Sequence, residues 1–305
     1  MWKLALFKIA PHTLGRLPVP VLYGLLSLIA NLIYTLAPGP RRNVWNNLRH
    51  VMPAGTPKSK MRTAARRIFR NVALYYGDLI RMPRMNIDHF VHHRLTFQGF
   101  QENLQPAIDA GNGVILMSGH YGNPELAVQV LIPMGVRLFA LTEPVKPPAL
   151  SRLINGFRSS TGHEFTPVSV GSVKTLMQRL RQGQVVALMS DRDIQGPRAV
   201  LPFCGTQTLM PTGPIEVALR TGAAVVPAFS WRTGRHQLVG SLEKPLELQR
   251  TGDLEQDVRA GTLRFLERLE RHLREDPSQW LVLEAIWAPL AEPALETASA
   301  GRGKA

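Results

Sequence analysis

His120 and Glu125 have the residue types and the spacing for acid–base chemistry. They follow an apolar run, Gly113–Ser118, that is typical of a buried strand, and a helical pattern begins at Glu125. A histidine at the end of a buried strand and within reach of a carboxylate suits a general base, because the carboxylate fixes the tautomer and stabilises the imidazolium. The spacing predicts Glu125 beside His120. A satisfied loop histidine, with a glutamate that only favours the helix start, fits the same pattern.

The sequence offers neither a good nucleophile nor a good metal site near this pair. Ser118 lacks a G-x-S-x-G pattern, and Cys204 has no basic neighbours in the sequence. The cluster of His89, His92 and His93 lacks the cysteine or paired carboxylate that would complete a metal site, so we interpret it as a basic surface loop. The sequence therefore predicts no metal, and direct attack by a substrate hydroxyl.

Alternating apolar runs and helical patterns, from about residue 86, must position these residues. Strands are expected at Gly113–Ser118, Val136–Leu141, Gln184–Ser190 and Ala224–Phe229, and helices at Glu125–Ile132, Ala149–Ser160, Ser172–Arg181, Ile215–Thr221 and Leu254–Leu273. This alternation predicts an α/β fold with a mostly parallel central sheet flanked by helices. In such sheets the chemistry gathers where strands end and helices begin. Asn123 is a suitable N-cap for the helix that follows His120.

Basic residues are concentrated at the N-terminus. The chain has 305 residues, 45% apolar composition, one cysteine and a net charge of +14. Residues 1–77 contain twelve Lys and Arg and no acidic residue, so the remainder is nearly neutral. A single cysteine excludes an intrachain disulfide framework. We expect a basic and apolar helical membrane-attachment module over residues 1–84, an α/β domain over 85–290 and a disordered tail over 291–305.

Val19–Leu36 is about long enough to cross a membrane as a helix, but it could also lie in the interface. A buried core helix is the alternative, and a signal peptide is disfavoured because no small-residue cleavage site follows. A second helix is expected over residues 57–80, with Arg62, Arg66 and Arg70 on its polar side. Anionic lipid or nucleic acid would relieve their repulsion. Because nucleic-acid motifs are absent and an apolar segment is adjacent, we predict an anionic membrane surface as partner and no nucleic acid.

Several blocks of sequence resemble the bacterial lipid A late acyltransferases, a branch of the lysophospholipid acyltransferase superfamily. The segment Gly119–Ala127 is similar to that family's H-x4-D/E motif, and the likeness continues in the same order through five further blocks: Asp191–Asp193, Leu201–Gly205, Met210–Pro214, Thr221–Pro227 and Asp276–Trp280. Thr142–Pro147 and Phe157-Arg158 resemble the phosphatidylinositol mannoside acyltransferases more than the enzymes of lipid A. The resemblance implies a glycerolphosphate acyltransferase-like fold.

The resemblance also implies a reaction and its residues. A fatty acyl chain would move from acyl-CoA or an acyl carrier protein, as co-substrate and without any cofactor, to a hydroxyl of a membrane glycolipid at the cytoplasmic face of the inner membrane. His120 would be the base, Glu125 would position the imidazole or the acceptor, and Asp191 or Asp193 would be a second carboxylate on His120. Substrate-binding positions would be Asn123, Glu143, Arg158, Arg192, Thr212 and Gly213.

Other interpretations remain open at this point. The Thr212-Gly213 pair could bind an anion through backbone N–H groups or simply cap a helix. A lipid A precursor or a lysophospholipid is the alternative acceptor, and water as acceptor would make the protein a hydrolase. A non-catalytic module that binds anionic membranes or nucleic acid is the more distant alternative. The oligomeric state is not predicted.

Overall fold

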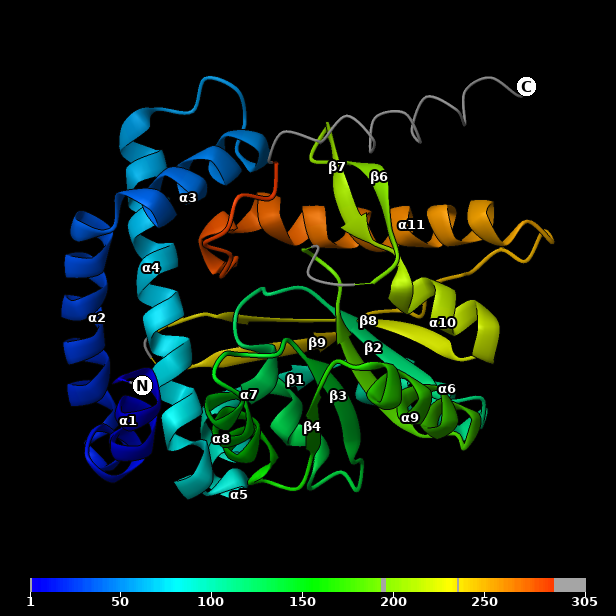
Figure 1. The fold of residues 1–305 in the computed structure, drawn as a ribbon, viewed down its shortest axis with the longest axis horizontal. Coiled ribbons are helices and arrows are strands. Elements are labelled where there is room, and N and C mark those ends of the chain that lie inside the picture. Colours follow the sequence, from blue (N-terminus) through cyan, green and yellow to red (C-terminus); the bar gives the residue numbers. More distant parts are fainter. Residues whose placement is uncertain (1, 193–195, 235, 288–305) are drawn as a thin grey trace.

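A seven-stranded sheet forms the centre of the computed structural model, which describes residues 2–192, 196–234 and 236–287 (Figure 1). The strand order is β1-β9-β8-β2-β5-β3-β4, and every neighbouring pair is parallel except β8 and β9. The strands are β1 (Leu95–Gln98), β2 (Val114–Ser118), β3 (Leu138–Thr142), β4 (Glu164–Pro167), β5 (Val185–Met189), β8 (Ala224–Arg232) and β9 (Leu238–Leu242). The predicted α/β fold with a mostly parallel sheet is confirmed. The tail expected over residues 291–305 lies outside the described residues.

Helices cover both faces of this sheet. One face packs against α9 (Val170–Arg181), α10 (Gly213–Thr221) and α11 (Leu254–Glu275), and the core there includes Ile115, Phe139 and Phe265. The other face packs against the region of α6 (Gln105–Asp109) and the segment after α7 (Pro124–Ala127), around Leu116 and Leu131. The remaining helices are α1 (Trp2–Ile9), α2 (Val19–Leu36), α3 (Pro38–Val51), α4 (Lys58–Arg81), α5 (Ile87–Arg94) and α8 (Pro148–Ser159).

Some elements differ from the sequence-based expectation. The helix expected over Glu125–Ile132 is shorter: α7 ends at Ala127, and a 3-10 turn continues over Val128–Leu131. An antiparallel hairpin of β6 (Arg198–Phe203) and β7 (Thr206–Pro211) was not predicted. Its sequence contains a proline within a strand and lacks clear alternation, so local pattern did not reveal it.

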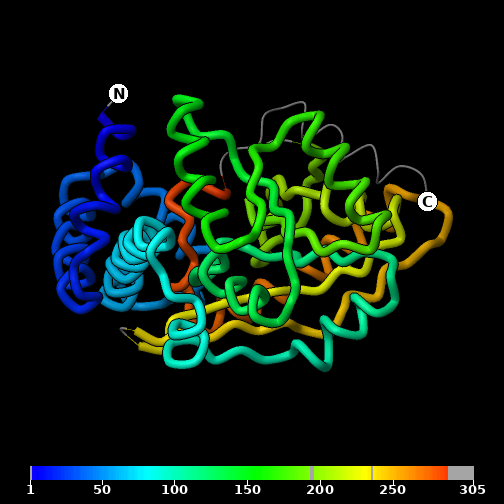
Figure 2. The backbone as a smooth tube through the Cα atoms, turned by 90° about the horizontal axis from the view of Figure 1, so that it is seen from below, coloured from blue at the N-terminus to red at the C-terminus, as the bar shows by residue number. Residues whose placement is uncertain are grey.

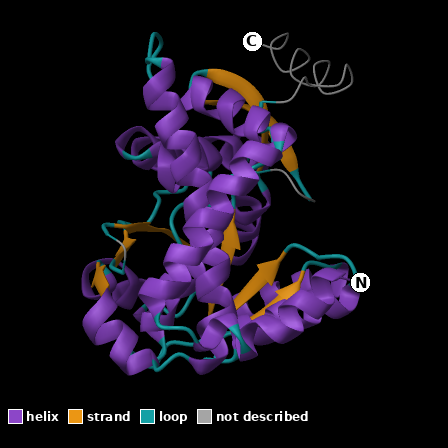
Figure 3. Ribbon diagram, turned by 90° about the vertical axis from the view of Figure 1, so that its left-hand side faces the viewer, coloured by secondary structure: helices purple, strands orange, loops and turns teal. Residues whose placement is uncertain are grey.

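The N-terminal helices gather at one end of the molecule, coloured blue and cyan in Figure 2, and in the view of Figure 3 they lie in front of the strands. Helix α2 packs along α4, and Gly77 allows the close approach, because a Cβ there would lie 2.4 Å from Leu26 Cδ1. Helix α4 in turn joins the α/β part, where Asn71 Nδ2 donates to the Ser278 carbonyl at 2.9 Å. The helices of residues 1–84 are therefore bonded directly to the part that carries the sheet.

The register between β2 and β5 fixes the location of the site. Ser118 at the end of β2 is paired with Met189 at the end of β5, and the two strands run parallel. His120 and Asp191 each come two residues after this aligned pair. Since carboxyl ends of parallel strands meet at one edge, the two side chains leave the sheet at the same place.

Gly113 sets the entry to β2 and gives a test of this arrangement. Its φ is +79°, and a Cβ would lie 2.3 Å from the Leu180 carbonyl oxygen; Gly111 has φ +74° with open space around it. We expect Gly111→Ala to lower the free energy of unfolding by about 1 kcal/mol, from the left-handed conformation alone. Gly113→Ala adds a backbone clash and should lower it by about 3 kcal/mol or more. If urea unfolding showed the same loss of stability for both variants, the close approach of Gly113 to the Leu180 carbonyl would be contradicted.

Candidate active site

A tight turn presents His120 at the carboxyl end of β2. Asn123 ends the turn as the N-cap of α7, since its Oδ1 accepts from Leu126 N–H at 3.1 Å. Gly122 has φ +70°, and a Cβ there would lie 1.9 Å from the Ser230 carbonyl oxygen, so only glycine fits. The turn therefore lies directly against strand β8.

The carboxylate of Asp191 holds the imidazole of His120. Nδ1 of His120 lies 2.7 Å from Asp191 Oδ1, and the His120 main-chain N–H donates to Oδ2 at 2.8 Å. Trp280 Nε1–H also donates to Oδ2, at 2.8 Å. Because an ionised carboxylate only accepts, Nδ1 carries a proton in this pair and Nε2 of the neutral ring keeps a lone pair. Nε2 is therefore the ring nitrogen that can accept a proton, as a general base requires, and 28% of the side chain is exposed.

Asp191 is fully buried, and its surroundings favour the ionised form. Burial by itself would raise the pKa of this carboxyl. The electrostatic interaction with His120 and the hydrogen bonds from His120 and Trp280 outweigh burial, so the pKa of Asp191 lies below its ordinary value. Gly119 makes room for the pair, since a Cβ there would lie 3.1 Å from Asp191 Cβ.

A cavity of about 640 Å³ opens beside His120. Its size is in the range of small-molecule sites. Its polar lining includes His120, Glu125, Glu143, Arg158 and Arg192. Apolar side chains from the sheet and its helices form much of the remaining wall, among them Leu116, Leu131, Leu138, Phe165, Leu176 and Leu188. The site therefore combines a histidine with arginine and glutamate side chains and an extended apolar surface.

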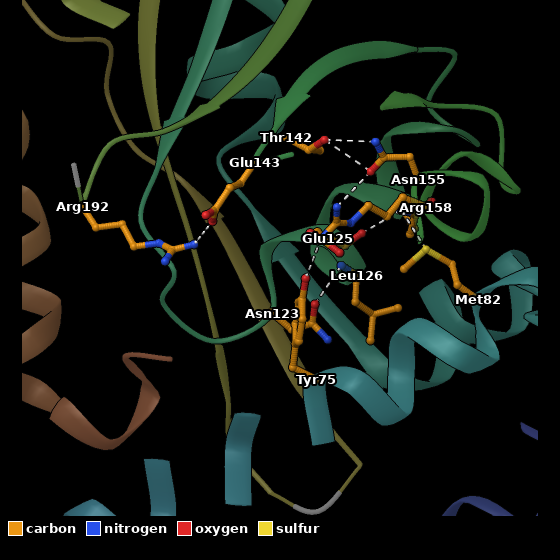
Figure 4. Close-up of polar contacts among 11 residues, drawn as sticks. Tyr75, Met82, Asn123, Glu125, Leu126, Thr142, Glu143, Asn155, Arg158 and Arg192 are labelled. Atoms are coloured by element: carbon orange, nitrogen blue, oxygen red, sulfur yellow. Dashed lines mark hydrogen bonds and ion pairs between the residues drawn. The ribbon is translucent and has the colours of Figure 1, made fainter. Parts of the chain in front are cut away.

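Glu125 contacts Arg158 and not His120, which corrects the expectation that it lies beside the imidazole (Figure 4). Its Oε1 lies 2.8 Å from Arg158 Nη2. Arg158 also donates to Asn155 Oδ1 at 3.0 Å and to the Tyr75 hydroxyl at 3.1 Å. Burial alone would lower the pKa of Arg158, but the charge of Glu125 raises it above its ordinary value, so the guanidinium stays charged. Helical direction explains the error, because the first turn of α7 carries Glu125 toward α8.

Glu143 and Arg192 form a second ion pair at the cavity. Arg192 Nη2 lies 2.6 Å from Glu143 Oε2, and Nη1 lies 3.2 Å from Glu284 Oε1. Figure 4 shows this pair apart from the group formed by Glu125 and Arg158. Arg192 follows Asp191 in sequence, so the end of β5 supplies both the partner of His120 and a guanidinium at the cavity.

Of the remaining predicted site residues, some line the cavity and others are buried away from it. Asn123 is buried beneath the turn, where its Nδ2 donates to Asp78 Oδ2 at 2.9 Å. Gly213 lines the cavity, whereas the buried side chain of Thr212 makes no capping hydrogen bond to α10. Asp193 lies outside the described residues. Of the two candidates, Asp191 is described, and it lies against His120.

Trp280 and Tyr75 are two site residues to which sequence reasoning gave no role. Trp280 appeared only as the end of the block Asp276–Trp280, where no spacing related it to Asp191. Tyr75 lies in the apolar pattern of α4, and nothing in that pattern distinguishes a core tyrosine from one that contacts Arg158. Only tertiary structure brings these residues to the site.

Comparisons with known proteins agree with this geometry. The model of a family described as bacterial lipid A biosynthesis acyltransferase matches residues 1–288. A phosphatidylinositol mannoside acyltransferase of Mycobacterium tuberculosis (strain CDC 1551 / Oshkosh) is 30% identical over 254 residues, which cover 79% of this chain and 75% of that protein. A protein of the same name from Mycolicibacterium smegmatis is 29% identical over 263 residues, 83% of this chain and 82% of the relative. The resemblance inferred from the motifs is confirmed.

Replacing the buried carboxylate tests its ionised state. In Asp191→Asn the amide must point its NH2 group at an N–H donor, so we expect a loss of about 1–3 kcal/mol in the free energy of unfolding at pH 7. The pKa of Asp191 is lower in the folded than in the unfolded state, so its contribution is present above the unfolded value and is lost as the pH falls through the folded value. The difference between parent and variant should therefore shrink in urea unfolding below about pH 4.

The exposed Asp109 provides the control for this measurement. Asp109→Asn should change the free energy of unfolding by about 0.5 kcal/mol or less at every pH. A loss in Asp191→Asn that stayed constant down to acid pH would show that the carboxylate is not held ionised.

Proposed function

The chain belongs to the bacterial lipid A biosynthesis acyltransferase family, and we propose that it moves a fatty acyl chain from an acyl thioester to a hydroxyl of a membrane glycolipid. The observation that carries this proposal is the contact of 2.7 Å between His120 Nδ1 and the buried Asp191, at the edge of a cavity with a large apolar wall. Acyl-CoA or an acyl carrier protein would supply the chain, with no further cofactor. The relatives named above support a phosphatidylinositol mannoside as acceptor.

In the proposed reaction, His120 acts as the general base. Nε2 takes the proton of the acceptor hydroxyl as its oxygen attacks the thioester carbonyl. The C–O bond forms, the tetrahedral oxyanion collapses, and the C–S bond breaks. The imidazolium, stabilised by Asp191, then returns its proton to the leaving thiolate. The products are an ester and a free thiol.

Direct attack is preferred to an acyl-enzyme because no good nucleophile adjoins His120 within the described residues. Burial, with the charge of Glu270 beside it, raises the pKa of the Cys204 thiol to about 12, so this cysteine is not a thiolate at neutral pH. Ser118 is buried, and its hydroxyl donates to the Gly119 carbonyl. The substrate hydroxyl is therefore the attacking group in this proposal.

The two ion pairs at the cavity favour a sugar as acceptor. Glu125 is paired with Arg158, and Glu143 with Arg192, so each guanidinium already has a carboxylate partner. Sugar hydroxyls both donate and accept, and they can bind a carboxylate and a guanidinium at once. Arg158 and Arg192 would still offer donors to a lipid phosphate near the sugar.

Helix α2 supports attachment to a membrane surface. One face of it packs on α4, while Val21, Leu25, Leu28 and Leu32 are exposed on the other. Val19–Leu36 is the one helix among the described residues that is long and apolar enough to span a membrane. Helix α4 lies along α2 and carries several arginines, which a spanning orientation would bring into hydrocarbon at high cost. We therefore propose that α2 lies in the membrane interface; the cytoplasmic face of the inner membrane stays a prediction.

The role of His120 is tested with the purified protein in vesicles that contain phosphatidylinositol mannoside, with palmitoyl-CoA as donor. His120→Ala should lower the rate of acyl transfer by about 10²- to 10⁴-fold, the usual contribution of a positioned base. Lipid mass spectrometry measures the product. His92→Ala, an exposed histidine on α5, should retain the parent rate. Turnover of His120→Ala close to that of the parent would exclude this residue as the base.

The membrane orientation is tested by changing the exposed face of α2 alone. Leu28 and Leu32 are 70% and 58% exposed, so Leu28→Ser combined with Leu32→Ser leaves the packing on α4 intact. Less apolar area would enter the bilayer, and binding to anionic vesicles should weaken by about tenfold or more in a sedimentation assay. Val170→Ser, at a 78% exposed position on α9, is the matched control. Equal binding by both variants would argue against α2 as the attachment surface.

A further inference from the structure

A second buried carboxylate, Asp78 of α4, contacts the turn of residues 120–123, here called the catalytic turn, at its Asn123 end, whereas Asp191 contacts its His120 end. Its side chain is 3% exposed. Oδ1 accepts from the Tyr23 hydroxyl of α2, and Oδ2 accepts from Asn123 Nδ2 at 2.9 Å and from the guanidinium of Arg232. Both oxygens are therefore used, and their donors come from α2, the catalytic turn and the end of β8.

Electrostatic interactions also stabilise the cluster around Asp78. The guanidinium of Arg232, 5% exposed, lies over the ring of Tyr23 at 5.6 Å from its centroid. Arg94 Nη2 donates to the Tyr23 hydroxyl at 3.3 Å. The guanidinium of Arg232 thus pairs directly with the carboxylate of Asp78, and Arg94 is linked to it through the Tyr23 hydroxyl, so a buried guanidinium depends on this carboxylate.

Asn123 connects this group to the base. It lies three residues after His120, and its side chain bonds to Asp78 on one side and caps α7 on the other. Its main-chain N–H donates to Ser230 Oγ at 3.0 Å. Without Asp78, the Nδ2 group of Asn123 would lose its partner in a buried site, and the turn would gain freedom to relax.

We propose that Asp78 is a positioning residue that ties the apolar helix α2, through the Tyr23 hydroxyl, to the turn that carries His120. The proposal rests on the acyltransferase function proposed above. Asp78 does not line the cavity, so it acts through Asn123 and not by contact with substrate. Because small displacements of a catalytic group reduce rates strongly, a looser turn lowers turnover while the donor site stays formed.

The test removes single hydroxyl groups from α2. Tyr23→Phe deletes the bond to Asp78. Tyr34→Phe is the matched control, because Tyr34 is a buried tyrosine of the same helix whose hydroxyl accepts from Trp45 Nε1 instead. Both variants are made in the full chain and assayed with palmitoyl-CoA in vesicles of phosphatidylcholine, phosphatidylglycerol and phosphatidylinositol mannoside.

Two readouts separate positioning from general destabilisation. The first is amide hydrogen exchange of residues 119–127, which should become about tenfold faster in Tyr23→Phe, with the 138–142 strand unchanged. The second is kinetic: kcat should fall by about tenfold, while KM for palmitoyl-CoA stays within about twofold. Tyr34→Phe should alter neither.

Asp78→Asn extends the test, with Asp257→Asn as its control. Asp257 is also a buried carboxylate, and it accepts from Thr251 far from the turn. Asp78→Asn should repeat the pattern of Tyr23→Phe with a larger loss of kcat. If Asp78→Asn does not fold, Tyr23→Phe alone decides the question.

The outcomes are distinguishable. Exchange and kcat of Tyr23→Phe that match those of Tyr34→Phe would overturn the proposal, as would a rise in KM without a fall in kcat. A parent protein that transfers no acyl chain would overturn the proposed function. Faster exchange of the turn in Tyr23→Phe would still support positioning by Asp78 in that case.

Discussion

The buried carboxylate of Asp191 is the constraint on which the site depends. An ionised carboxylate without exposure is stable only if donors satisfy both of its oxygens, and here they come from the side chain and main chain of His120 and from Trp280. The in-register pairing of β2 and β5 brings the first two donors into place, and the segment after α11 brings the third. A shift of β5 by one residue would leave the carboxylate without its partners, so the strand register and the imidazole orientation are fixed together.

The catalytic turn lies between two such carboxylates. Asp191 bonds to its beginning at His120, and Asp78 bonds to its end at Asn123. In between, Gly122 N–H donates to the Gln279 carbonyl at 2.8 Å. Loops are ordinarily the mobile part of an α/β protein, but this one has a fixed partner at each end and one in the middle. The general base that we propose for His120 would gain from such rigidity, because its geometry would not have to be established at each encounter with substrate.

Much of the fold and part of the site could be predicted from the sequence. The strands at β2, β3, β5 and β8 are continuous apolar runs, and their alternation with helices was enough for the fold class. The short strands β1 and β4 have four residues each and no such run, so they were missed. His120 could be named as a candidate because it follows a buried strand, and Asp191 because of the family resemblance. The contacts of Asp191 with His120, of Trp280 with Asp191 and of Asp78 with Asn123 join segments far apart in the chain, and no local pattern encodes them.

Local sequence spacing alone also led to the expectation that Glu125 lies beside His120. His120 and Glu125 are close in the sequence, but at the start of a helix successive side chains point in different directions. The arginine that Glu125 contacts lies 33 positions further along the chain, on α8. Removal of either partner would leave the other as a buried charge without its counter-ion, which is costly. The charged groups of the cavity therefore occur as ion pairs. Any assignment of Arg158 to a substrate phosphate must take into account that Glu125 already balances its charge.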